Sequence, residues 1–252
     1  MVHQWSDPVD RLLTKTFEKL SEKMIFFKKP QSILLTHPGV KGIKKVINRD
    51  YPDAILHEYQ CQQPTIEWEK LGLVGREIDL VVSHMVINDQ AWLMQHILAV
   101  SSYLKPGCPW IFSCIGDSSG ILRSSEVMPS AYGWTSGAQD PETLLSFLQI
   151  QGFKNPVFER FRFICQYPSS QYLLEDCVEL HKNLVLNSGC DRKVLMAQLE
   201  EVCGSEKKPL DYALDMVLGV VLQTDKIDVD LSGHDSEYPI DWAGLKKNSD
   251  RK

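Results

Sequence analysis

Hydrophobic positions along the chain alternate between short apolar runs and longer stretches with helical spacing. Four runs are typical of buried strands: 32–35, 54–59, 78–87 and 109–116. Three stretches have the three- and four-residue spacing of a helix with one apolar face: 42–51, 90–104 and 140–152. The run at 78–87 is apolar on both faces, as expected of a central parallel strand. This alternation predicts an α/β fold with a doubly wound, mostly parallel sheet.

Both ends of this pattern carry additional elements. Residues 6–27 predict an opening helix, and a third edge strand is expected near Ile66. Long apolar strands at 155–168 and 210–225 predict an antiparallel C-terminal pair, with two helices between them at 170–186 and 191–204. Taken together, these elements predict a seven-stranded sheet with an antiparallel C-terminal strand.

The predicted domain division follows from these elements. One domain is expected over 1–225, followed by a polar tail at 226–252. The domain includes an N-terminal helical segment at 1–30 and a helical insertion at 168–208. The tail has no regular period, so we expect it to lie on the surface or to be partly disordered.

Composition narrows the class of protein. The chain has 252 residues, a net charge of −6 and a pI near 5.7, which argues against a bulk nucleic-acid binder. It contains no apolar run of membrane-spanning length and no secretory signal, so we expect a cytoplasmic location without membrane contact. The seven cysteines are scattered without a C-x-x-C pair, which predicts reduced thiols and no metal site.

Topology alone indicates where a ligand would bind. Ligands of open α/β sheets bind at the carboxyl ends of the strands, which here are 36–42, 58–60, 83–86 and 114–119. His37 and Ser83 are therefore candidates, although His37 could equally cap a helix or lie on the surface. His84 could equally be a core histidine.

Several segments carry a resemblance to a known family. They are "DLVVSHMVI", "YLKPGCPWIFSCIG", "LLSFLQIQGFKNPVFERFRFICQYPSSQYLLEDCVEL" and "KKPLDYALDMVLGVV". In their order they resemble class I S-adenosylmethionine-dependent methyltransferases. The "F-x-x-P", "Y-P-S-S-x-x-L-L" and "P-L-x-Y-x-L-x-x-x-L-G" patterns resemble the BioC group, which methylates malonyl-acyl carrier protein in biotin synthesis. The resemblance implies a Rossmann-like fold, S-adenosylmethionine as cofactor and acyl carrier protein as partner.

The cofactor loop departs from the pattern of that family. Its D-x-G-x-G-x-G motif falls on Leu35, His37, Gly39 and Lys41, so only Gly39 keeps a glycine. The acidic residue that holds the ribose hydroxyls falls on Gln60, with Glu58 two positions earlier on the same strand face.

The resemblance also implies roles for other residues. It assigns His37, Gly39, Gln60, Ser83 and His84 to the cofactor. It assigns Trp92 and Arg123 to the substrate, although Trp92 could instead pack in the core. Carboxyl methylation needs no general base, because a carboxylate is already ionised at neutral pH. It needs a cation to orient the substrate, for which Arg160 and Arg162 are further candidates.

Two functions therefore stay open at this point. The first is a BioC-like methyltransferase that acts on the free carboxyl of malonyl-acyl carrier protein or malonyl-CoA. The second is a catalytically impaired methyltransferase-fold protein that binds a partner, such as an intact paralogue. Hydrolysis by a serine nucleophile has little support, because the chain contains no G-x-S-x-G motif.

Overall fold

The computed structural model describes most of the predicted sheet and the helices that cover it. The described residues are 7–27, 29–37, 42–60, 73, 75, 77–85, 90–116, 120–123, 126–129, 141–173, 197 and 209–224. The helices are α1 (Asp7–Met24), α2 (Ile43–Asp50), α3 (Gln90–Tyr103) and α4 (Pro141–Ile150). The strands are β1 (Ser32–His37), β2 (Ile55–Gln60), β3 (Leu80–His84), β4 (Pro109–Ile115), β5 (Gly120–Arg123), β6 (Glu126–Pro129), β7 (Phe153–Tyr167) and β8 (Leu210–Gln223).

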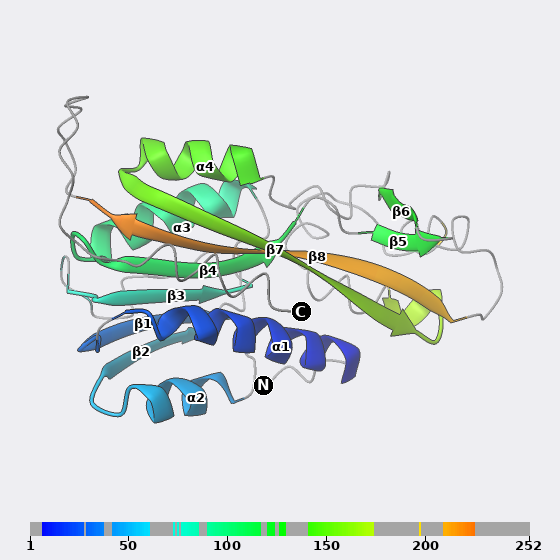
Figure 1. Cartoon of the computed structure of the whole chain (residues 1–252), viewed down its shortest axis with the longest axis horizontal. Coiled ribbons are helices and arrows are strands. Elements are labelled where there is room, and N and C mark those ends of the chain that lie inside the picture. The colour runs from blue at the N-terminus through cyan, green and yellow to red at the C-terminus, as the bar shows by residue number, and fades with distance from the viewer. Residues whose placement is uncertain are drawn as a thin grey trace.

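One mixed sheet organises these elements (Figure 1). Its strand order is β2-β1-β3-β4-β8-β5-β6, and β7 pairs with β8. The pairs formed among β2, β1, β3 and β4 are parallel, whereas β8 runs antiparallel to both β4 and β7. The predicted α/β class, with parallel strands followed by an antiparallel C-terminal pair, is confirmed.

Among the described residues the sheet has eight strands, which are six of the seven predicted strands and two additional ones. The addition is the hairpin of β5 and β6, which joins β8 through the pairing of Ile121 with Tyr212. Strands of four residues are too short to show a hydrophobic period, so the sequence did not indicate them. The strand expected near Ile66 and the tail at 226–252 lie outside the described residues. So do the helices expected at 170–186 and 191–204, apart from residues 170–173 and 197.

Two hydrophobic cores flank the sheet, because successive side chains of a strand point to opposite faces. In β3, Leu80 and Val82 face one core while Val81 faces the other. The first core is covered by α1 and α2, and the second by α3 and α4. All residues of β3 and β4 are buried, as predicted for central strands with helices on both sides.

Asp79 fixes the amino-terminal end of the parallel strands. Its Oδ2 accepts hydrogen bonds from the backbone N–H groups of Gln31 and Ser32, both at 3.0 Å. Its Oδ1 accepts a hydrogen bond from Lys105 Nζ at 2.6 Å. One carboxylate thus ties the start of β1, the start of β3 and the loop before β4, far from the carboxyl ends.

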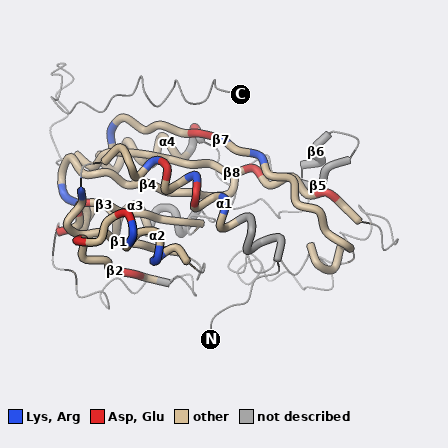
Figure 2. Tube along the Cα trace, turned by 60° about the horizontal axis from the view of Figure 1, so that its bottom comes forward, with Lys and Arg blue, Asp and Glu red and all other residues tan. Residues whose placement is uncertain are grey.

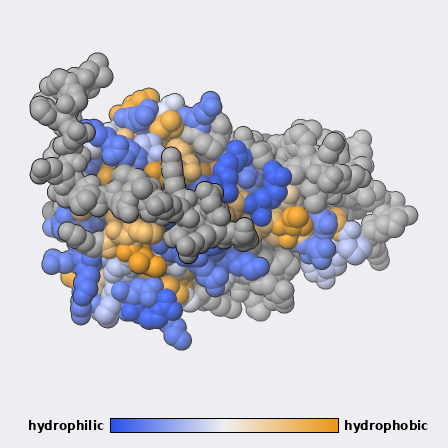
Figure 3. All heavy atoms as spheres, viewed as in Figure 1, coloured by the Kyte–Doolittle hydropathy of each residue, from blue (hydrophilic) through white to orange (hydrophobic). Residues whose placement is uncertain are grey.

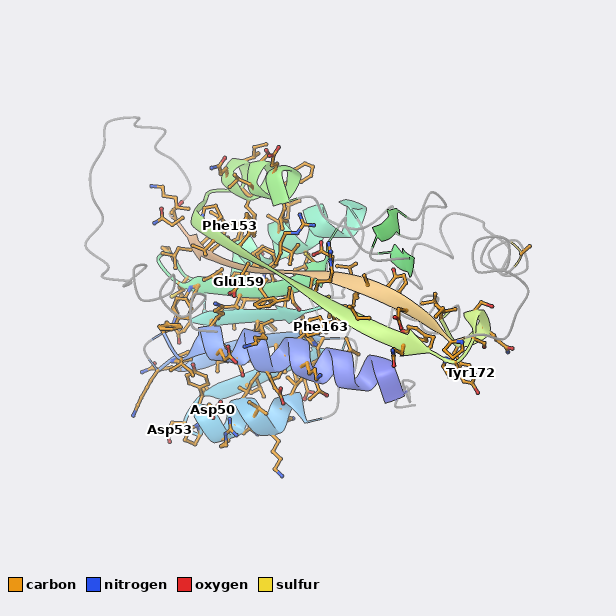
Figure 4. All side chains as sticks on the ribbon, turned by 45° about the vertical axis from the view of Figure 1, so that its right-hand side comes forward. Asp50, Asp53, Phe153, Glu159, Phe163 and Tyr172 are labelled. Carbon is orange, nitrogen blue, oxygen red and sulfur yellow. The ribbon has the colours of Figure 1, made fainter. Side chains whose placement is uncertain are left out.

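The last two strands extend well beyond the parallel strands. The lengths of β7 and β8 are 15 and 14 residues, against seven in β4, and their far ends project past the carboxyl ends of β3 and β4 (Figure 1). Helix α1 packs against β7, where Lys23 forms an ion pair with Glu159 and Phe163 packs against the first core (Figure 4). The projecting ends of β7 and β8 therefore lie beside the edge of the sheet where the parallel strands end.

The described surface is polar and of mixed charge. Basic and acidic residues are interleaved along α1 and β7 (Figure 2), and hydrophilic residues surround smaller hydrophobic spots in Figure 3. Within the described ranges, no helix combines the length and the hydrophobicity needed to cross a membrane.

Candidate functional site

The four parallel strands end together at one edge of the sheet. The register pairs the last residues of β1 and β2, His37 with Gln60, and pairs His84 at the end of β3 with Ser113 of β4. The loops predicted to form the site therefore begin side by side, at the position where α/β sheets bind ligands.

A three-membered polar cluster lies at the ends of β1 and β2. His37 Nε2 lies 3.1 Å from Glu58 Oε1, and Lys44 Nζ, on the first turn of α2, donates to Glu58 Oε2 at 3.0 Å. His37 is buried, the Glu58 side chain is 21% exposed and the Lys44 side chain is 58% exposed. The expectation that His37 could lie on the surface is therefore wrong. The ring of His37 instead places the Glu58 carboxylate at the end of the strands.

The charges within this cluster follow from its contacts. Burial raises the pKa of Glu58, but hydrogen bonds and charge from Lys44 and His37 outweigh burial and lower that pKa below its usual value. Burial lowers the pKa of His37 more strongly than Glu58 raises it. At neutral pH we expect an ionised Glu58 that accepts hydrogen bonds from a neutral His37 and a charged Lys44.

His84 lies at the end of β3 on the face covered by α1. Its Nδ1 lies 2.8 Å from Ser113 Oγ, and its ring packs edge-on against Phe17 at 5.7 Å between centroids. Burial, and next the repulsion from His37 when that ring is protonated at low pH, lower the pKa of His84 to about 3, although a hydrogen bond with the backbone of Leu13 opposes this shift. His84 is thus a neutral histidine in the core between β3 and α1, next to the polar cluster.

Ser83 faces the opposite side of the sheet. Its hydroxyl accepts a hydrogen bond from Trp110 Nε1 at 2.9 Å and lies 2.8 Å from His96 Nε2. All three residues are buried. The described contacts of Ser83 join β3, β4 and α3, and its assignment to the cofactor stays a prediction.

An ion pair between a buried aspartate and a partly exposed arginine lies at the end of β4. Asp215 of β8 pairs with Arg160 of β7, and its backbone oxygen accepts a hydrogen bond from Gly116 N at 2.8 Å. A Cβ at Gly116 would come within 2.9 Å of Asp215 Cγ and closer still to Oδ2, so the glycine makes room for the carboxylate. Arg160, one of the arginines considered for the substrate, is thereby fixed at this edge of the sheet.

Gly42, next to the polar cluster in sequence, is a residue that the motif alignment did not include. It is the N-cap of α2 with φ of 85°, a conformation that favours glycine, and a Cβ there would meet nothing within 4 Å. The signal was available, because a glycine directly before an amphipathic helix marks a tight entry turn. Lys44 and Asp215 gave no comparable signal, since their roles depend on partners distant in sequence.

The other predicted site residues are described only in part. Gly39 lies outside the described residues. Gln60, Trp92 and Arg123 lie at the end of β2, in α3 and in β5, and their side chains are not among those described. Within the described part of the chain, no three His, Cys, Asp or Glu side chains are placed to hold a metal ion.

Comparison with known proteins agrees with this architecture. In sequence, the chain is similar to malonyl-[acyl-carrier protein] O-methyltransferase 1 of Coxiella burnetii, with 25% identity over 207 residues, covering 78% of this chain and 72% of that protein. No protein-family model matches the chain.

Among solved structures, a protein assigned as a methyltransferase from Bacillus halodurans C-125 superposes with a TM-score of 0.52 at 10% identity, covering 82% of this chain and 98% of that one. Phosphoethanolamine N-methyltransferase 2 of Haemonchus contortus gives a TM-score of 0.49 at 12% identity over 83% of this chain. The chain spans about half the length of that protein, 52%. The superposition with the Bacillus halodurans structure shows a methyltransferase-like Rossmann fold, as the sequence resemblance implied.

Proposed function

We propose that the protein is an S-adenosylmethionine-dependent methyltransferase that methylates the free carboxyl of malonyl-acyl carrier protein or malonyl-CoA. The fold supports the reaction class, and the similarity to the Coxiella burnetii O-methyltransferase supports the acceptor. The observation that carries the proposal is the Glu58 carboxylate, held at the ends of β1 and β2 where the motif predicts an acidic group but the alignment gives Gln60.

The described residues fit the cofactor at its ribose end. An ionised carboxylate with two oxygens suits a pair of hydroxyl donors, and Glu58 would hold the ribose there. Gly42, with open space above its Cα, would let the backbone at the start of α2 approach the ligand closely. His37 occupies the position of the first motif glycine, and its ring is turned to Glu58.

Methyl transfer requires the protein to position the two reactants rather than to transfer a proton. S-adenosylmethionine, when bound, supplies an activated methyl group on its sulfonium sulfur. The acceptor carboxylate is ionised at neutral pH, so His84, held neutral by burial, is not needed as a base. The contribution expected of the chain is a cation that orients the acceptor. Arg160, fixed by Asp215 at the end of β4, and Arg123 of β5 are the two candidates.

The test is a transfer assay with methyl-labelled S-adenosylmethionine and malonyl-acyl carrier protein or malonyl-CoA. The wild-type protein is expected to form the labelled methyl ester. Glu58→Ala is expected to lower kcat/KM at least tenfold, because a hydrogen bond to a charged group contributes about 1.5–3 kcal/mol. Glu142→Ala, which removes an exposed glutamate of α4, serves as the control and is expected to keep wild-type kcat/KM.

Failure to form the ester with either acceptor, by folded protein that binds the cofactor, would refute the acceptor assignment. Failure to bind the cofactor as well would favour the alternative, a methyltransferase-fold protein that acts by binding a partner. Loss of cofactor binding would then be explained by the contacts that Glu58 already makes with Lys44 and His37.

A further inference from the structure

We propose that Lys44 is an internal competitor for the ribose site, and that its ion pair with Glu58 sets the affinity of the protein for its cofactor. This inference rests on the proposed function, because it assumes that Glu58 accepts hydrogen bonds from the ribose. It adds a determinant that lies outside the glycine motif, on the first turn of α2.

Both oxygens of the Glu58 carboxylate have partners within the chain. Oε1 lies 3.1 Å from His37 Nε2, and Oε2 accepts a hydrogen bond from Lys44 Nζ at 3.0 Å. An ionised carboxylate offers about four acceptor directions, two on each oxygen, and the internal donors already use one on each. Cofactor binding must therefore displace at least one internal donor or share an oxygen with it.

Lys44 is the donor that can leave. Its side chain is 58% exposed, and its flexible stem can carry the ammonium group into water. The His37 side chain is only 2% exposed and lies on the same face of β1 as Ile33 and Leu35 of the first core. An exposed lysine–glutamate pair contributes little free energy, about 0.2–1 kcal/mol. Release of Lys44 is thus a small but specific penalty on binding.

Removal of Lys44 is accordingly expected to tighten binding. Lys44→Met keeps most of the side-chain length and removes the ammonium group, which frees Glu58 Oε2 for a hydroxyl donor. The exposed-pair energy corresponds to an affinity gain of about threefold, with fivefold as the upper end. If Lys44 instead supported cofactor binding, Lys44→Met would weaken the affinity.

The chain offers a matched control in the next residue. Lys45 lies on the same turn of α2, is exposed and carries the same charge, and its ammonium group has no ion pair among the described residues. Lys45→Met therefore reproduces the change in net charge without freeing Glu58. We expect it to leave the affinity unchanged.

The experiment is a calorimetric titration of wild type, Lys44→Met and Lys45→Met with S-adenosylhomocysteine. Tighter binding by Lys44→Met alone supports the inference. Equal or weaker binding by Lys44→Met, with a wild type that binds, overturns the inference and leaves the proposed function standing. Absence of binding by all three folded proteins overturns both.

A second readout follows Lys44 directly. In wild-type protein, saturating S-adenosylhomocysteine is expected to release Lys44 from Glu58 and so to raise the acetylation rate of Lys44, measured by mass spectrometry, relative to that of Lys45. A fall in the acetylation rate of Lys44 on binding would mean that the lysine stays on Glu58 or contacts the ligand, which overturns the inference.

Discussion

Acidification from pH 7.5 to pH 5 is expected to remove about 4 kcal/mol from the free energy of unfolding through two buried histidines alone. His84 and His96 are fully buried, and burial is the main cause that lowers the pKa of each from 6.5 to about 3. Both are therefore neutral in the folded protein over this range. In the unfolded chain they take up protons as the pH falls below 6.5.

The sign follows from that difference in bound protons. Because the unfolded state binds more protons than the folded state between pH 6.5 and about pH 3, stability falls as the pH falls through this window. Each proton that only the unfolded state binds changes the free energy of unfolding by about 1.4 kcal/mol per pH unit. At pH 5 this amounts to about 2 kcal/mol for each histidine. Above about pH 7.5 neither histidine contributes to the pH dependence.

Two variants isolate this contribution. His84→Asn can keep a polar atom toward Ser113, the partner of Nδ1, and His96→Gln can keep one toward Ser83, the partner of Nε2. Urea unfolding at several values between pH 7.5 and pH 5 gives the slope of unfolding free energy against pH. Each variant is expected to flatten that slope by about 1.4 kcal/mol per pH unit below pH 6, whatever its stability at neutral pH. A wild-type slope retained in both variants would mean that these histidines are not held neutral.

Gly219→Ala is expected to cost about 3 kcal/mol, at the upper end of the range for overpacked cores. Gly219 pairs with Phe112 of β4 on one side and with Phe158 of β7 on the other. A Cβ there would lie 2.6 Å from Phe112 Cε1 and closer still to Cζ and Cε2. The ring is fully buried and packs against Trp110, with centroids 4.8 Å apart, so it cannot move aside freely.

A double-mutant cycle tests whether overlap with the Phe112 ring causes this loss of stability. Phe112→Leu alone is expected to destabilise, because it removes part of a buried ring. In the Gly219→Ala background the same change should be close to neutral or stabilising, since it removes the overlap. Chemical unfolding of the four proteins is expected to give a coupling energy of about 2 kcal/mol. Additive effects would show that the alanine is accommodated without contact to the ring.

The sequence predicted the sheet well where hydrophobic patterns are long. The run at 78–87 is apolar on both faces, and it contains β3, which is buried on both. Asp79 lies just before that strand, at the end away from the site, and joins it to β1. The hairpin of β5 and β6 was missed, since its strands are short and are fixed by pairing with β8, which follows far later in the chain.

The candidate site was predictable only in outline. Topology placed His37 and His84 at the same edge, which the register confirms. The contacts of Glu58 depend on where the loop and α2 return over β2, and a motif alignment does not contain that information. The alignment therefore pointed to Gln60, while the carboxylate that the structure holds at the strand ends is Glu58.

The central claim, that the carboxyl ends of β1 and β2 bind S-adenosylmethionine, is tested most directly by a calorimetric titration of wild-type protein and Glu58→Ala with S-adenosylhomocysteine. The account predicts micromolar to submillimolar binding by the wild type and at least tenfold weaker binding by Glu58→Ala. No heat of binding at millimolar ligand, with the protein shown to be folded, would contradict it. Binding that Glu58→Ala leaves unchanged would place the cofactor elsewhere.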